Sequence, residues 1–158
     1  METVIIDTRE KPKAIQTILK QFEAAGVNSI RSKLYSGDYQ FMSNPYLVVD
    51  RKQSLSELCN NVVQDHRRFR DELVRAKEVG ISVVVLVEHG GEIKSIEDVP
   101  NWVNPRLSIS PLAVSGERLY KILKAMEYTY NVRFEFCDKR QTGKRILEIL
   151  MEGKDVKA

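Results

Sequence analysis

The sequence has little cysteine and no long hydrophobic run. Its two cysteines, Cys59 and Cys137, lie far apart and form no C-x-x-C pair, so neither a zinc site of that spacing nor a disulfide framework is expected. The longest apolar run, residues 83–87, has the length of a strand and not of a membrane span. The first residues lack the basic and apolar regions of a signal peptide. These absences predict an intracellular protein with reduced thiols and no membrane partner.

The excess of positive charge is also small. The formal net charge is +3, which does not by itself predict a nucleic-acid partner, although lysine and arginine still cluster locally. Apolar residues make up 42% of the 158 residues and charged residues 30%, as is typical of a globular protein. No internal repeat or low-complexity segment is visible. We therefore expect one domain over residues 1–152 and a frayed tail over residues 153–158.

Hydrophobic periodicity predicts strands that alternate with helices. Strands are expected at residues 3–6, 27–34, 39–42, 46–51, 81–87 and 132–136. Helices are expected at residues 12–25, 54–79, 116–130 and 142–151, with a kink or break near Asp65 where the second becomes heavily charged. Residues 88–115 hold three of the five prolines and predict an irregular loop, with Trp102 anchored in the core. This order favours an α/β fold with a mixed central sheet flanked by helices.

Residues 37–52, GDYQFMSNPYLVVDRK, contain the residues best suited to chemistry. The turn signal Ser43-Asn44-Pro45 separates two strand-like runs, which predicts a β-hairpin. Asp38 begins the first run and Asp50 ends the second, a buried run typical of a central strand. Since side chains alternate along a strand, Asp50 and Lys52 share one face and Arg51 points to the other.

Two carboxylates and a lysine on one face predict a metal-and-water site. Oxygen ligands suit Mg²⁺, for which Mn²⁺ can substitute, and hydrolysis of a phosphodiester needs such a cation. Lys52 would position water or the phosphate, and burial beside a metal could lower its pKa. Asp7 ends the buried run 3–6 and offers a third carboxylate, or it caps the next helix. An ordinary surface ion pair of Asp50 and Lys52 is the alternative.

This stretch resembles the nuclease motif GDx(n)ERKx(3)D of the XPF family of structure-specific endonucleases, within the PD-(D/E)xK, restriction-endonuclease-like superfamily. The matching residues are Gly37-Asp38 and Asp50-Arg51-Lys52, and residues 6–10 resemble the family's opening acidic element. The likeness is clear in the first half of the chain, and residues 136–144, FCDKRQTGK, resemble short phage or bacterial members. It implies a restriction-endonuclease-like fold and a location in the bacterial cytoplasm or nucleoid, a phage-infected cell, or a eukaryotic nucleus.

The resemblance also implies roles for individual residues. Asp38, Asp50 and Asp7 would be metal ligands, Lys52 the catalytic lysine, and Arg51 a residue that contacts DNA or braces the site. Glu10 is a further acidic candidate in the opening element. The motif's glutamate is Asp50 here, and its last acid falls on Ser56. Glu57 could replace that acid, but the pattern Ser54-x-x-Glu57 favours a helix cap instead.

Basic residues on the expected helices are candidates for contacts with DNA phosphates, with solvated helix faces as the alternative. They are Arg67, Arg68, Arg70, Lys121 and Lys124. The function expected from the resemblance is a magnesium-dependent DNA endonuclease that cuts branched or flapped DNA in repair or recombination. A Holliday-junction resolvase or a restriction-type nuclease is the first alternative. A catalytically inactive DNA-binding or scaffolding subunit is the second. Because no separate DNA-binding domain is visible, a homodimer or a partner protein would help to hold DNA.

Overall fold

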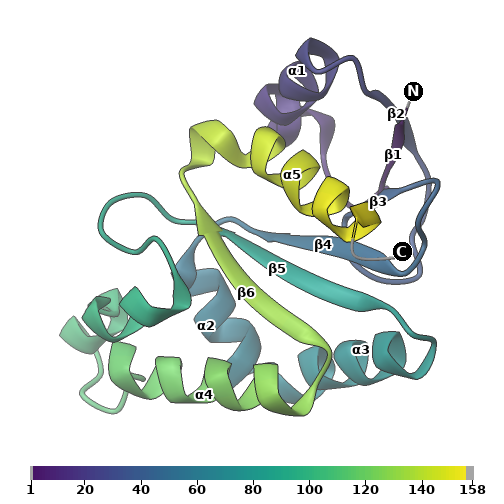
Figure 1. Ribbon diagram of the computed structural model, residues 1–158. Helices are drawn as coiled ribbons and strands as arrows, with labels where there is room; N and C mark the ends of the chain where they lie inside the picture. Colours follow the sequence, from purple (N-terminus) through teal and green to yellow (C-terminus); the bar gives the residue numbers. More distant parts are fainter. Residues whose placement is uncertain (1, 156–158) are drawn as a thin grey trace.

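The computed structural model describes residues 2–155, and within that range six strands form one mixed sheet (Figure 1). The strands are β1 (Thr3–Ile6), β2 (Asn28–Arg31), β3 (Tyr39–Phe41), β4 (Leu47–Lys52), β5 (Ser82–Glu88) and β6 (Val132–Cys137). Their order is β2-β1-β3-β4-β5-β6. Strand β3 is antiparallel to both β1 and β4, and the other neighbouring pairs are parallel. The predicted mixed α/β fold and the β3–β4 hairpin are confirmed.

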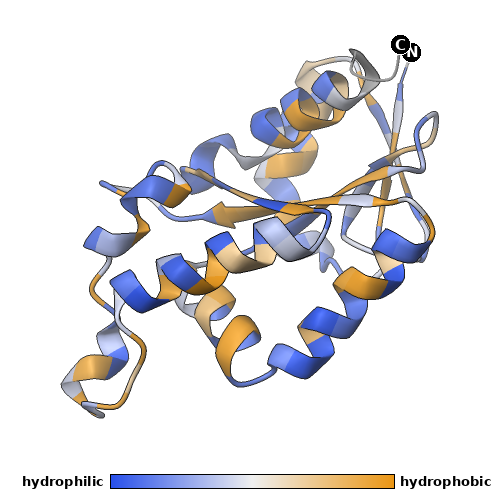
Figure 2. Cartoon of the chain, turned by 60° about the horizontal axis from the view of Figure 1, so that its bottom comes forward, coloured by the Kyte–Doolittle hydropathy of each residue, from blue (hydrophilic) through white to orange (hydrophobic). Residues whose placement is uncertain are grey.

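Helices cover both faces of the sheet (Figure 1). Helices α1 (Gln16–Ala24) and α5 (Thr142–Asp155) lie on one face, and α2 (Leu55–Val63), α3 (His66–Glu78) and α4 (Gly116–Thr129) lie on the other. The helices carry both hydrophobic and hydrophilic residues, interspersed along their length as is typical of amphipathic helices that pack on a sheet (Figure 2). Two hydrophobic clusters result within the described residues, and β4 and β5 contribute alternate side chains to both.

Several boundaries differ from those expected. The predicted helix at 12–25 begins as a 3₁₀ turn, Pro12–Ile15, before α1, and the predicted break near Asp65 separates α2 from α3. Strand β2 is shorter than predicted, and all four of its residues are exposed because it forms one edge of the sheet. Helix α5 continues to Asp155, past the expected start of the tail at residue 153. Residues 156–158 lie outside the described part of the chain.

The long connection after β5 contains two 3₁₀ turns, Ile96–Asn101 and Pro105–Ser108. Trp102 between them is only 8% exposed and belongs to the cluster beneath α2, α3 and α4, so its predicted role as a core anchor is confirmed. In the described residues, no helix has the length and apolar character needed to cross a bilayer.

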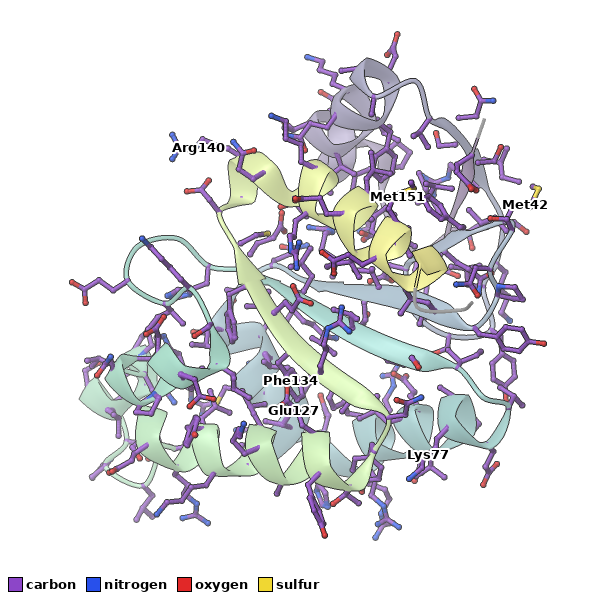
Figure 3. The ribbon with its side chains drawn as sticks, in the orientation of Figure 1. Met42, Lys77, Glu127, Phe134, Arg140 and Met151 are labelled. Atoms are coloured by element: carbon purple, nitrogen blue, oxygen red, sulfur yellow. The ribbon has the colours of Figure 1, made fainter. Side chains whose placement is uncertain are left out.

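Polar contacts fasten α4 to its neighbours (Figure 3). The backbone N–H of Phe134 in β6 donates to the carboxylate of Glu127 over 2.9 Å, and the Nζ of Lys77 in α3 donates to the carbonyl of Thr129 over 3.0 Å. The first contact satisfies a donor on strand β6, which forms the other edge of the sheet. Helices α3 and α4 therefore form a joined layer on the side of the sheet that carries Asp50 and Lys52.

Candidate active site

The last three residues of β4 alternate between the two faces of the sheet. Val48, two residues before Asp50, is buried in the cluster beneath α2, α3 and α4, so Asp50 and Lys52 point to that same side. The Nζ of Lys52 lies 3.4 Å from the Oδ2 of Asp50, and their side chains are 13% and 19% exposed. Both side chains line an open cleft of about 330 Å³ at the carboxyl end of β4. The predicted pair therefore sits in a cleft and not on a flat surface.

Asp38 is brought to this pair by the turn that leads into β3. Its backbone N–H donates to the carbonyl of Val49 over 2.8 Å, and its Oδ2 accepts from the N–H of Arg51 over 2.8 Å. Gly37 adopts a φ of +73°, and a Cβ atom there would lie 2.8 Å from the Cβ of Val48. Only glycine fits this turn without a clash, because it has no Cβ. The Gly37-Asp38 pair of the sequence motif therefore has a steric reason.

The charges of the three groups are strongly interdependent. Burial, the neighbouring charge of Asp50 and a hydrogen bond between the two carboxyl groups raise the pKa of Asp38 to about 9. For Lys52, burial acts to lower the pKa, but the carboxylates of Asp50, Glu57 and Asp38 outweigh it and the pKa is raised. In the metal-free site the pKa of Lys52 is therefore raised, and a lowered pKa beside a bound metal stays a prediction. Its Nζ also lies 5.3 Å from the ring centroid of Phe69 in α3.

Arg51 points to the opposite face and is enclosed by acids. Its guanidinium donates to both carboxylate oxygens of Glu10, over 2.6 and 3.0 Å, and to Glu88 over 2.6 Å. The hydroxyls of Tyr39 and Thr142 complete the network by donating to Glu10 and Glu88 over 2.8 and 2.6 Å. The side chain of Arg51 is only 5% exposed, so the expectation that it contacts DNA is wrong. Arg51 braces the end of β4, and the carboxylate of Glu10 accepts hydrogen bonds from Arg51 and Tyr39.

Asp7 is fully buried and does not line the cleft. Its Oδ1 accepts from the N–H of Leu34 over 2.8 Å, and its Oδ2 accepts from the N–H and Nε of Arg9 over 3.0 and 2.6 Å. Burial acts to raise the pKa of Asp7, but these hydrogen bonds lower it overall. The expectation of a third metal-binding carboxylate is thereby corrected, because Asp7 anchors two loops instead. No cluster of three or more metal-ligating side chains occurs among the side chains that the structure describes, residues 2–153.

Glu57 caps the helix that follows β4. The Oγ of Ser54 accepts from the N–H of Glu57 over 3.0 Å, and the carboxylate of Glu57 accepts from the N–H of Gln53 over 2.7 Å. The predicted capping role is confirmed. The same carboxylate also borders the cleft and contributes to the field at Lys52. The charge of Glu57 therefore helps to raise the pKa of Lys52, although Glu57 is not adjacent to Asp38 and Asp50 in the motif.

Five basic residues border the cleft, of which Arg51, Lys52 and Arg68 were predicted site residues and Arg9 and Arg75 were not. Tyr35 also borders the cleft. Arg67 lies along a shallower groove beside it, and Arg70 borders neither. The spacing of Arg68 and Arg75, two helical turns, is a signal that could have identified Arg75.

Lys121 and Lys124 lie on α4, away from the cleft. The Nζ of Lys124 is 3.4 Å from the carboxylate of Glu97, and this ion pair is exposed to solvent. Contact of these two lysines with DNA stays a prediction.

Comparison with known proteins identifies similar sequences and folds. The model of a family described as the ERCC4 domain matches residues 6–150. The structure of XPF from Aeropyrum pernix is 25% identical in sequence, with a TM-score of 0.67, and the match covers 96% of this chain and 65% of that one. The structure described as XPF from Aeropyrum pernix in complex with DNA is 24% identical, with a TM-score of 0.68, and the match covers 99% and 66%. No curated protein matches the chain. The chain spans slightly less than two thirds of the length of these solved structures.

Proposed function

The chain belongs to the ERCC4 domain family, and from this premise we propose that it is a metal-dependent DNA endonuclease that hydrolyses phosphodiester bonds in branched or flapped DNA. The observation that carries the proposal is the grouping of Asp38, Asp50 and Lys52 on the floor of an open cleft. The relative described as a complex with DNA supports DNA as the ligand.

The donor set of the cleft fits Mg²⁺, with Mn²⁺ as a substitute. The two carboxyl groups lie close together in a half-buried position, and partial burial together with Asp50 raises the pKa of Asp38 to about 9. This raised pKa indicates a local deficit of positive charge, which a divalent cation held by Asp38 and Asp50 would remove. Mg²⁺ is commonly bound by one or two carboxylates, water and substrate phosphate, and does not need a cage of side chains. When bound, it would polarise the phosphate and make a water molecule more acidic.

Lys52 supplies a fixed positive donor next to the carboxylates. Because its pKa in the metal-free site is raised by Asp50, Glu57 and Asp38 despite burial, Lys52 is a hydrogen-bond donor and a positive charge there. Its position 3.4 Å from Asp50 and over the ring of Phe69 limits where the ammonium can move. Lys52 would orient the attacking water or stabilise the charge that develops on the scissile phosphate.

The test is cleavage of a panel of labelled DNAs: a flap, a four-way junction and a linear duplex, with Mg²⁺, Mn²⁺ or EDTA. The wild-type protein is expected to cut the flap with either metal and to be inactive in EDTA. Asp50→Asn and Lys52→Ala should each lower the rate by about 10²–10³-fold. Lys20→Ala is the control, since Lys20 is exposed on α1 at the opposite face of the sheet.

Parental activity in Lys52→Ala would contradict the mechanism. Preferential cutting of the four-way junction would instead assign a resolvase activity. Binding without metal-dependent cleavage would assign a DNA-binding or scaffolding subunit.

A further inference from the structure

Tyr35 is an exposed aromatic residue at the rim of the cleft. It is 64% exposed and lies in the loop between β2 and β3, three residues before Asp38. Tyr35 borders the same cleft as Asp38, Asp50 and Lys52. Among the described residues it makes no hydrogen bond or aromatic contact. Packing therefore does not explain why a large aromatic side chain stands there.

The loop that carries Tyr35 is held in place on both sides of the ring. The N–H of Leu34 donates to the buried Oδ1 of Asp7 over 2.8 Å, and the side chain of Leu34 is only 7% exposed. On the other side, Arg9 donates to the carbonyl of Gly37 over 3.4 Å, and Asp38 pairs with β4. The backbone at Tyr35 is consequently fixed before any ligand arrives. A ring presented in this way loses little conformational freedom when it binds.

Helix α3 and the residue before it contribute two arginines to the cleft lining, together with Asp65 and Glu72. Arg75 forms no ion pair with the described side chains of residues 2–153. Arg68, two turns earlier, forms one pair with Glu72 at 3.8 Å and is 83% exposed, so that pair is weak. Arg9 adds a third cation to the cleft lining, with a side chain that is 63% exposed although its Nε is paired with Asp7 over 2.6 Å. The cleft thus combines an exposed ring with guanidinium groups that are accessible to phosphate.

This combination is the one that binds unpaired nucleic-acid strands: cations follow the backbone, and an aromatic ring stacks on a base. In a duplex both faces of each base are covered by neighbouring pairs, so a protein ring can stack only where a nucleotide is unpaired or flipped out. We propose that Tyr35 is a specificity-determining residue that stacks on an unpaired base beside the scissile phosphate. The cleft then selects DNA that is single-stranded at that point. The position of the stacked base beside the scissile phosphate rests on the proposed nuclease function, whereas the stacking itself does not.

The experiment is a double-mutant cycle between the protein and the DNA. Single abasic sites are placed in turn along the unpaired arm of a flap, and KM and kcat are measured for wild type, Tyr35→Ala and Tyr35→Phe. Tyr35→Ala should raise KM roughly 5- to 150-fold, the effect expected from the loss of one stacked base, and should leave kcat nearly unchanged. Tyr35→Phe keeps the ring and should behave as the wild type. Tyr128→Ala is the matched control, because Tyr128 is 94% exposed on α4 and does not border the cleft.

One abasic position should reproduce the effect of Tyr35→Ala in the wild type and have no further effect in Tyr35→Ala. Binding of a labelled single-stranded oligonucleotide, measured by anisotropy in the Asp50→Asn background, gives a readout that does not need cleavage. If the wild type cuts flaps but Tyr35→Ala matches it and no abasic position is coupled, the stacking role is overturned and the nuclease function stands. If the wild type cuts no DNA but Tyr35→Ala still weakens oligonucleotide binding, the nuclease function fails and the stacking role stands.

Discussion

At the scale of single residues, Asp38 holds a carboxyl group where its charge is disfavoured. Folding places it in a half-buried position beside Asp50, which raises its pKa from the ordinary value of 3.8 to about 9. The folded protein therefore keeps a proton that the unfolded chain releases between these two pH values. By linkage, this group makes the metal-free protein less stable as the pH rises from about 4 to about 9. The site thus reduces the stability of the metal-free fold.

Asp38→Asn is expected to stabilise the metal-free protein. Asparagine carries no charge and can still accept from the N–H of Arg51. We expect a gain of about 1–3 kcal/mol in the free energy of unfolding at pH 8, no gain at pH 4, and loss of cleavage. Urea denaturation in EDTA across this pH range measures the effect. The control is Asp138, whose pKa is shifted in the opposite direction: hydrogen bonds from Arg140 lower it to about 2. Asp138→Asn should therefore not stabilise the folded protein at pH 8. Destabilisation by Asp38→Asn at pH 8 would refute this account.

Arg51 is the residue on which the stability of the opposite face depends. Replacement by methionine removes the cation and leaves Glu10 and Glu88 buried without their partner. We expect Arg51→Met to lower the free energy of unfolding by about 3–5 kcal/mol. Chemical denaturation measures it, with Arg68→Met as the control, since Arg68 is 83% exposed and should contribute at most about 1 kcal/mol. A cost for Arg51→Met as small as that of the control would show that the network does not brace β4.

At the scale of elements, the turn before β3 determines where Asp38 lies. Gly37 has a positive φ, and a side chain there would collide with Val48, whereas Gly91 has a positive φ but open space around it. Gly37→Ala should therefore cost roughly 2–5 kcal/mol, and Gly91→Ala only the backbone term of about 1–2 kcal/mol. Thermal or urea unfolding of the two variants compares them directly. Equal costs would mean that the contact with Val48 is relieved without effect on the turn.

Local periodicity predicted most elements because hydrophobic spacing is set by neighbours in the chain. The alternation in Asp50-Arg51-Lys52 was enough to assign the faces of β4, and Ser54-x-x-Glu57 was enough to predict a cap. The role of Asp7 was not accessible in this way. Its partner Leu34 is 27 residues distant, and the link is a backbone N–H that any residue type would supply. No residue pattern indicates such a bond.

The partners of Arg51 and the residues at the rim of the cleft were missed for the same physical reason. Arg51 meets Glu10 and Glu88 across 41 and 37 residues, so its burial follows only from the order of strands in the sheet. Tyr35 and Arg75 border the same cleft because a loop and a helix from different parts of the chain meet there. Sequence spacing described the floor of the site, whereas its walls required the tertiary structure.

At the scale of the whole molecule, the two hydrophobic clusters share strands β4 and β5. Val48 and Val85 belong to the cluster that includes Trp102, and Val49 and Leu86 belong to the one that includes Ile146. Each cluster packs against one face of the same two strands, so loss of either cluster would expose one face of the sheet. We therefore expect one cooperative unfolding transition. Disruption of either cluster should therefore be felt in both.

Ile146→Ala tests this coupling. Ile146 is fully buried in α5, and its truncation should cost about 2–5 kcal/mol. The midpoint of urea unfolding should fall equally when followed by the fluorescence of Trp102 and by circular dichroism, although Trp102 lies on the other side of the sheet. Leu112→Ala is the control, because Leu112 is 94% exposed and should shift neither midpoint. An unchanged fluorescence midpoint in Ile146→Ala would indicate two independently unfolding halves.

The alternation along β4 has a consequence for which changes in the gene this protein can tolerate. The side chains of Asp50 and Lys52 point to the cleft, and the side chain of Arg51 points to the interior. Three consecutive codons therefore encode two separate roles, because side chains alternate between the two faces of the strand. A substitution affects one task, but insertion or deletion of one codon between Leu47 and Asp50 exchanges the faces of all the residues that follow in the strand. The guanidinium would then stand beside Asp38, and the acid and lysine would enter the interior against Glu10 and Glu88. Insertion or deletion of a single codon in this strand should therefore impair function far more than substitutions at the same positions.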